Sequence, residues 1–169
     1  MIKRQLVQSV CEEVTQIPLN PNFKEDLEAF VLQMPIVRFI QLTFVTVKHG
    51  MVEISIPYRD ELSFTAGSFQ AGPIGMLMDI AACGAVGTTL PAGWAFSTID
   101  FTTKIVAPAT GERFLARGHV VSSGKTVSVG EADVFAVREG RETLCATGLV
   151  TTRNFEVTPS PTPPDALGT

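Results

Sequence analysis

One carboxylate stands alone in the most apolar part of the sequence. Between Ile74 and Val86, Asp79 is the only charged residue. Gly72 and Pro73 come just before this run, where a helix over it would begin. A carboxylate can take a proton from water, and an amide at a helix N-terminus can donate to a developing negative charge. Since proline has no N–H, Gly72 is the natural donor, and the pair can promote attack of water on a carbonyl carbon.

The spacing of these two residues predicts a site that is shared by two chains. Asp79 comes seven residues after Gly72, which is about 10 Å along a helix that rises roughly 1.5 Å per residue. One helix therefore keeps the carboxylate and the amide too far apart to act on one carbonyl group. Two such helices that run antiparallel across a two-fold axis would bring Asp79 of one chain toward Gly72 of the other. We expect an obligate homodimer, and two such dimers can pair into a dimer of dimers.

The elements that must position this helix follow from the hydrophobic pattern. The segment 74–86 is apolar on every side, which predicts a buried helix that needs a wrapping. Alternating apolar residues predict strands over 38–47 and 51–58, joined at His49-Gly50, and then an antiparallel meander over 96–106, 113–121, 125–137 and 142–152. The predicted fold class is α+β, with one long central helix wrapped by a curved antiparallel sheet of about six strands.

The two ends of the chain differ from this central part. Apolar residues at helical spacing predict a short helix over 3–16, and a second helix is expected after Asn22, which can cap it in a capping box with Glu25. The last residues are rich in proline and poor in apolar side chains, which is typical of a disordered end. We therefore divide the chain into an N-terminal helical segment, 1–35, the main domain, 36–155, and a Pro-rich tail, 156–169.

The composition limits the possible partners. The 169 residues carry a net charge of −4 with scattered Lys and Arg, which argues against nucleic acid. Three cysteines far apart and two histidines predict neither disulfides nor a metal site. The N-terminus does not read as a signal region, and no uninterrupted apolar run reaches about 18 residues. We expect a cytoplasmic protein that binds no membrane.

Several short motifs occur in one order along the chain. Gln70-Ala71-Gly72 is followed by Asp79 nine positions after Gln70, and Thr98 stands two positions before Asp100. Pro108-Ala109 and Gly124-Lys125-Thr126 come at later turns. In this order and spacing, residues 38–153 resemble the hotdog-fold acyl-CoA thioesterases, within them the PaaI-like family of phenylacetic acid degradation.

The resemblance implies hydrolysis of an acyl-CoA thioester and assigns roles to residues. Asp79 would be the general base, Gly72 the oxyanion donor, and Thr98 the residue that orients the water. Gln70 stands where the family has a histidine; its carboxamide can donate a hydrogen bond but supplies no proton. The expected substrate contacts are Phe64, Ala71, Pro73 and Lys125. No cofactor is expected, because coenzyme A is part of the substrate.

Other readings of these residues stay open. Phe64 falls where many relatives carry Asn or Gln, so together with Gln70 it makes a non-catalytic acyl-CoA-binding protein credible. A hotdog hydratase or dehydratase would need an Asp and His pair, which the scarcity of histidine disfavours. Asp79 itself could be a structural carboxylate that pairs across a dimer interface, and Lys125 a solvated turn residue. Cys83, with no His candidate nearby, is expected to be a small core residue.

Overall fold

The computed structural model describes residues 18–157. In chain order, the elements are α1 Phe23–Leu32, α2 Pro35–Phe39, β1 Thr43–Lys48, β2 Met51–Pro57, a 3-10 turn Asp60–Leu62, β3 Ser63–Thr65, β4 Ser68–Phe69, α3 Ala71–Gly87, β5 Trp94–Ile105, β6 Arg113–Ser123, β7 Val127–Arg138 and β8 Arg141–Glu156. The helix predicted over 3–16 and almost all of the Pro-rich tail lie outside the described residues. The division into three segments therefore stays a prediction.

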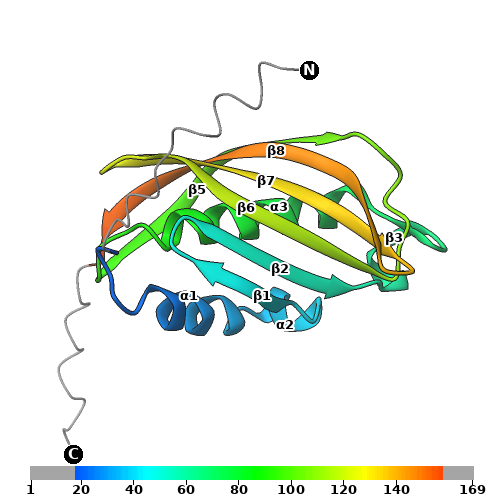
Figure 1. Ribbon diagram of the computed structural model, residues 1–169, viewed down its shortest axis with the longest axis horizontal. Helices are drawn as coiled ribbons and strands as arrows, with labels where there is room; N and C mark the ends of the chain where they lie inside the picture. Colours follow the sequence, from blue (N-terminus) through cyan, green and yellow to red (C-terminus); the bar gives the residue numbers. More distant parts are fainter. Residues whose placement is uncertain (1–17, 158–169) are drawn as a thin grey trace, which may run out of the picture.

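A six-stranded antiparallel sheet curves over α3 (Figure 1). The strand order is β1-β2-β6-β7-β8-β5. Alternate residues of the strands point toward α3, and the largest fully buried side chains include Ile54 and Ile56 of β2, Phe114 of β6, and Leu77 of α3. This confirms the expected class, α+β with a long helix wrapped by six strands.

The helix α3 lies unusually close to the middle of the sheet. A side chain at Gly118 would overlap the backbone at Ala81, and one at Gly130 would come 2.8 Å from the carbonyl oxygen of Ala82. Two strands therefore need glycine where the helix crosses them. The close approach fixes which face of α3 is buried, and so which face remains for a site.

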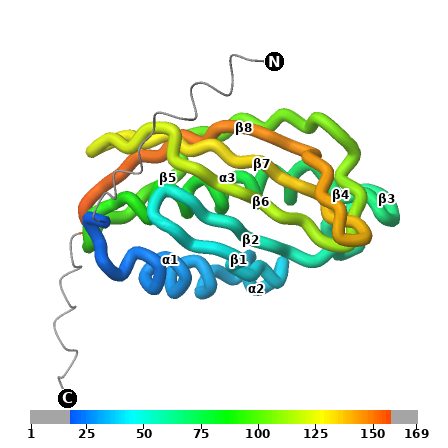
Figure 2. The backbone as a smooth tube through the Cα atoms, in the orientation of Figure 1, coloured from blue at the N-terminus to red at the C-terminus, as the bar shows by residue number. Residues whose placement is uncertain are grey.

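The two short N-terminal helices cover the edge of the sheet at β1 (Figure 2). Leu27 and Val31 of α1 are buried, as is Val37 of α2. The start of α1 lies at the C-terminal end of α3, whereas β3 and β4 lie at its N-terminal end (Figure 1). The two ends of the central helix are thus closed by different parts of the chain.

Two predictions about these elements are wrong. Residues 38–47 do not form one strand, because Pro35 occupies the first turn of α2, where its missing N–H is tolerated, and β1 begins only at Thr43. Asn22 stands at the N-cap of α1 but its side chain makes no capping bond. Instead, the backbone N–H of Asn22 donates to Oδ1 of Asn20, so no capping box with Glu25 forms.

The predicted four-stranded meander is correct only for β6, β7 and β8. The first strand of the four, β5, pairs with β8, and β6 pairs with β2 instead. Hydrophobic alternation marks each segment as a strand, but it carries no information on which strands pair. The arrangement places β5 at an edge of the sheet, next to α3.

Candidate functional site

Asp79 lies on a half-exposed stripe of α3. Most residues of the helix from Ile74 to Val86 are buried, but Met76, Asp79 and Ile80 are only partly covered, as is Gly87 beyond them. Asp79 and Ile80 lie three and four residues after Met76, and Gly87 lies seven after Ile80, which places these positions along one face of the helix. The predicted burial is therefore confirmed for most of the segment, whereas this stripe is only partly covered within one chain.

The carboxylate of Asp79 is held through one of its two oxygens. The hydroxyl of Thr98 donates to Oδ1 at 3.0 Å, and the thiol of Cys83 donates to the same oxygen at 3.3 Å. Thr98 reaches this position from β5, whose register shifts between Thr98 and Asp100. Among residues 18–157, no protein donor bonds to Oδ2. One oxygen fixes the orientation, and the other is available to a water molecule.

Cys83 is the member of this cluster that sequence reasoning missed. Its side chain is 4% exposed, and Sγ lies 3.3 Å from both Asp79 Oδ1 and Thr98 Oγ1. Burial, together with the charge of Asp79, raises the pKa of the Cys83 thiol to about 12. The thiol is therefore protonated at neutral pH and acts as a donor, not as a nucleophile. The spacing of four residues from Asp79 was the available signal.

The N-terminus of α3 is capped by its own preceding residue. Gln70 occupies the N-cap in an extended conformation, and its Oε1 accepts a hydrogen bond from the backbone N–H of Gly72 at 2.6 Å. Both residues are exposed. The Gly72 N–H that was predicted to be a free oxyanion donor is thus already hydrogen-bonded. Its acceptor is the side-chain oxygen of Gln70, which resembles the carbonyl oxygen of a substrate in charge and geometry.

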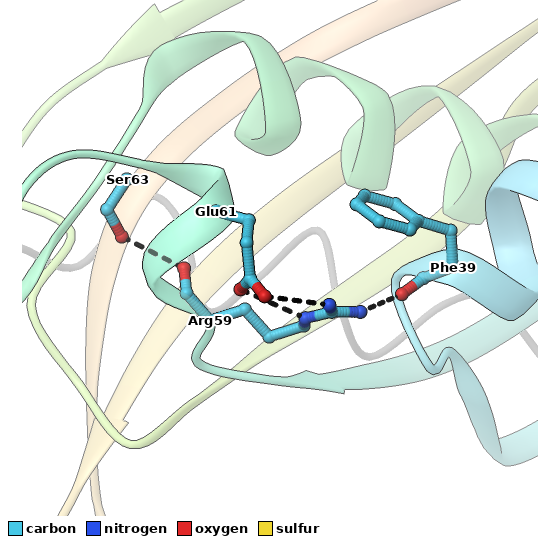
Figure 3. Close-up of polar contacts among 4 residues, drawn as sticks. All are labelled: Phe39, Arg59, Glu61 and Ser63. Carbon is cyan, nitrogen blue, oxygen red and sulfur yellow. Dashed lines mark hydrogen bonds and ion pairs between the residues drawn. The ribbon is translucent and has the colours of Figure 1, made fainter.

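An ion-pair cluster anchors the segment that carries Phe64 (Figure 3). The guanidinium of Arg59 donates to Glu61 at 3.2 Å and to the backbone carbonyl of Phe39, and it stacks over the ring of Phe39. The hydroxyl of Ser63 donates to the carbonyl of Arg59 at 3.0 Å. These contacts tie the start of β3 to the end of α2. Phe64 itself is 70% exposed.

The predicted substrate contacts do not meet in one place. Phe64 and Ala71 line a cavity of about 490 Å³ beside the N-terminus of α3. Lys125 lines a different cavity, of about 320 Å³, together with Leu90 near the C-terminus of α3. The helix has 17 residues and spans roughly 25 Å, so Lys125 cannot act beside Gly72 of its own chain. Pro73 is half-buried in the first turn of α3.

Other types of site find no support in the described part of the chain. Residues 18–157 contain no group of three His, Cys, Asp or Glu side chains that could hold a metal ion. None of the helices described is long and apolar enough to cross a membrane. The cluster around Asp79 is therefore the arrangement of polar groups on which a function can be argued.

Several solved structures with the same fold are named as thioesterases or as members of the thioesterase superfamily. A thioesterase family protein from Silicibacter pomeroyi is 28% identical, with a TM-score of 0.77 over 79% of this chain and 98% of that one. The E. coli PaaI protein from the phenylacetic acid degradation operon is 15% identical, with a TM-score of 0.71 over 83% and 99% of the two chains. A thioesterase from Haemophilus influenzae is 16% identical, with a TM-score of 0.69 over 79% and 90%.

No protein-family model and no curated protein sequence matches the chain. The similarity is thus seen in the comparison with solved structures. It confirms the resemblance that the motifs around residues 70–79 indicated.

Proposed function

From the premise that this chain has the hotdog fold of thioesterase-superfamily proteins, we propose that it is an acyl-CoA thioester hydrolase in which Asp79 is the general base. The observation that carries the proposal is the carboxylate held by Thr98 and Cys83 through Oδ1, with Oδ2 open on the half-exposed face of α3. A base must be oriented before it can take a proton at the right moment. Two fixed donors on one oxygen provide that orientation.

The reaction that this geometry supports is addition of water to the thioester carbonyl. Oδ2 of Asp79 accepts a proton as the water oxygen bonds to the carbonyl carbon. The negative charge then develops on the former carbonyl oxygen, which accepts a hydrogen bond from the Gly72 amide at the positive end of the helix dipole. Collapse of this intermediate breaks the C–S bond, and the proton held by Asp79 leaves with the thiolate of coenzyme A. The products are a carboxylic acid and free thiol.

The proposed site needs two chains. Gly72 and Asp79 lie about 10 Å apart along one helix, so the amide and the base that act on one carbonyl come from different protomers. The edge strand β5 supports such pairing, because it presents Ile99, Phe101 and Ile105 with about half of their surface exposed. A long edge strand with exposed apolar side chains invites pairing with another strand.

Gln70 competes with the substrate in this mechanism. The Gly72 amide can donate to the thioester oxygen only after Oε1 of Gln70 has withdrawn from it. The carboxamide lies at an exposed position, so its side chain can rotate away without opening the core. When substrate binds, the Gly72 amide exchanges its bond to the neutral oxygen of Gln70 for a bond to the neutral thioester oxygen. The bond becomes stronger only when that oxygen becomes negatively charged, so it stabilises the transition state more than the bound substrate.

The same bond favours a second candidate function, a protein that binds acyl-CoA without hydrolysing it. If Gln70 remained on Gly72 in the bound state, the oxyanion would have no donor, and the hydrophobic cavities would still hold the acyl group. The orientation of Asp79 by Thr98 and Cys83 favours hydrolysis. The bond between Gln70 and Gly72 is the observation that favours binding without hydrolysis.

Release of free thiol decides between the two functions. The protein is incubated with acyl-CoA thioesters of increasing chain length and with phenylacetyl-CoA, and free coenzyme A is measured over time. We expect steady turnover with at least one of them. Tight binding of acyl-CoA with no release above the uncatalysed rate would establish the binding protein instead.

A further inference from the structure

A third cavity, largely apolar, lies at the C-terminal end of α3, under α1. Its volume is about 360 Å³, within the roughly 300–1,000 Å³ that small-molecule sites occupy. We call it the α1 cavity. Its principal lining residues are Phe23, Leu27, Phe30, Gly87, Trp94 and Phe96. Four aromatic rings in one small cavity can bury a large apolar ligand surface.

The α1 cavity lies on the same face of the molecule as Asp79. On α3, Asp79, Cys83 and Gly87 follow one another at intervals of four residues, which places them on one side of the helix. On β5, Thr98 contacts Asp79, and Phe96 and Trp94 follow at intervals of two on the same side of the strand. The seam between helix and strand therefore leads from the carboxylate toward the cavity, past the buried side chain of Cys83.

The polar groups on the cavity wall are already paired. The side-chain amide of Asn20 donates to Asp26 Oδ2 at 2.8 Å, and its Oδ1 accepts from the backbone N–H of Asn22 at 2.9 Å. Asp26 is exposed and places a negative charge at the rim of the cavity. A hydrocarbon group can enter without leaving a polar partner unpaired, whereas a carboxylate would be repelled and desolvated.

We propose that the α1 cavity binds the uncharged hydrocarbon end of the acyl group whose thioester is attacked at Asp79. This inference rests on the proposed function and adds the substrate class, medium-chain acyl groups without a charge at the far end. Gly87 lies eight residues beyond Asp79, about 12 Å along the helix. An extended chain advances roughly 1.2 Å per bond, as the 3.3–3.6 Å of a three-bond residue shows, so about ten bonds are needed to reach the cavity.

The single tryptophan of the chain makes binding visible without catalysis. Trp94 lines both the α1 cavity and the cavity beside Lys125, so its fluorescence reports binding in either one, and the G87A variant described below assigns the response to the α1 cavity. The probe is S-decyl-N-acetylcysteamine, a thioether that cannot be hydrolysed and carries no nucleotide. We expect a saturable blue shift of Trp94 emission with this probe. The S-ethyl compound should bind at least 100-fold more weakly, since each buried methylene contributes roughly fourfold in affinity.

Two glycines of α3 give a matched pair of variants. A Cβ at Gly87 would come 2.7 Å from Cε1 of Phe96, so G87A forces this ring into the cavity. A Cβ at Gly84 would meet Val52 and Leu27 at ordinary distances of 3.5 and 3.7 Å. Both changes replace a glycine of α3 by alanine, Gly84 in the helix interior and Gly87 at its last residue. We expect G87A to weaken binding of the decyl probe at least tenfold and G84A to leave it unchanged.

The charge at the rim gives an independent test that does not depend on G87A being folded. A decyl probe with a carboxylate at its far end should not shift Trp94 emission in the wild-type protein. Asp26→Asn keeps an oxygen that can accept from Asn20 and removes the charge, so this variant should bind the carboxylated probe measurably while its affinity for the uncharged probe changes little.

The outcomes separate this inference from the proposed function. No response of Trp94 to the decyl probe would overturn the cavity assignment, and so would equal affinities of folded G87A and wild type. If G87A does not fold, equal affinities of the wild-type protein for the S-decyl and S-ethyl probes overturn it, because an apolar cavity must favour the longer chain. A response of Trp94 without thiol release from any acyl-CoA would keep the cavity and refute the hydrolase.

Discussion

The two ends of α3 are built for different tasks. At its N-terminus, Gly72 is exposed, and among residues 18–157 its amide is bonded only by the side chain of Gln70, which is also exposed. At its C-terminus, Leu90 is buried, and α1 with Trp94 and Phe96 closes an apolar cavity. The positive end of the helix dipole suits an oxyanion, and the other end does not. In the proposed hydrolase, the N-terminal end of one rigid helix thus contacts the thioester that reacts, and its C-terminal end contacts the acyl group that is recognised.

Removing the proposed base is expected to have the largest effect, because it should abolish the chemistry and leave binding of the acyl group unchanged. Asp79→Asn keeps the size of the side chain and an oxygen that can accept from Thr98, but it cannot take a proton from water. We expect kcat for thiol release to fall by roughly 100-fold or more, with unchanged affinity for the S-decyl probe. Near wild-type turnover in a folded Asp79→Asn protein would show that the carboxylate serves only the structure.

A mixed dimer tests whether the two halves of the site come from two chains. Asp79→Ala and Gly72→Pro are each expected to be inactive. When they are unfolded and refolded together, about half of the dimers contain one chain of each kind and hence one intact site. Activity should recover to roughly a quarter of the wild-type level. Parents that exchange subunits but show no recovery would require a site within one chain.

Freeing the Gly72 amide from Gln70 should raise activity moderately, whereas the two preceding changes lower it. Gln70→Ala removes a bond that the substrate must displace, worth about 1 kcal/mol or roughly fivefold in kcat/KM. The same change removes the N-cap of α3 and should lower the free energy of unfolding by about 1 kcal/mol. Activity and stability would then change in opposite directions. A fall in kcat/KM would mean that the carboxamide assists the reaction.

The smallest expected effect concerns Cys83. The pKa of its thiol is about 12 in the folded protein against an ordinary value of 9.0. Because the folded value is the higher one, this group adds stability that is fully present below pH 9 and is lost as pH rises toward 12. Denaturant unfolding should therefore give a lower free energy of unfolding at about pH 10 than at about pH 8 for the wild-type protein, and this part of the difference should be absent in Cys83→Ser. For kcat, Cys83→Ala should cost a few-fold and Cys83→Ser, which keeps a donor to Asp79, almost nothing.

The sequence predicted the parts of this molecule that depend on local pattern. An apolar run with Pro73 at its start predicted α3, and alternation predicted most of the strands. Strand pairing was not predictable in the same way, since β5 is placed beside β8 by packing between residues far apart in the chain. The motif around Thr98 indicated its neighbour Asp79, and the structure puts the two side chains 3.0 Å apart.

The rest of the candidate site depends on side-chain conformation. Nothing in the residue type of Gln70 shows that its oxygen turns back onto Gly72, because a carboxamide can equally point to solvent. The role of Cys83 was missed because cysteine in an apolar helix is ordinarily a small core residue. Its partner from β5 is distant in sequence. Such contacts appear only when the strands are in place.

The pairing of β5 with β8 also means that β5 cannot join the sheet until β8 has been synthesised. The strand Trp94–Ile105 is synthesised well before its partner Arg141–Glu156, and within residues 18–157 its other edge has no neighbour in the sheet. Thr98 lies on β5, which pairs in this sheet only with β8, so the bond from Thr98 to Asp79 depends on β8 being in place. The carboxylate of Asp79 is thus oriented only once β8 has been made.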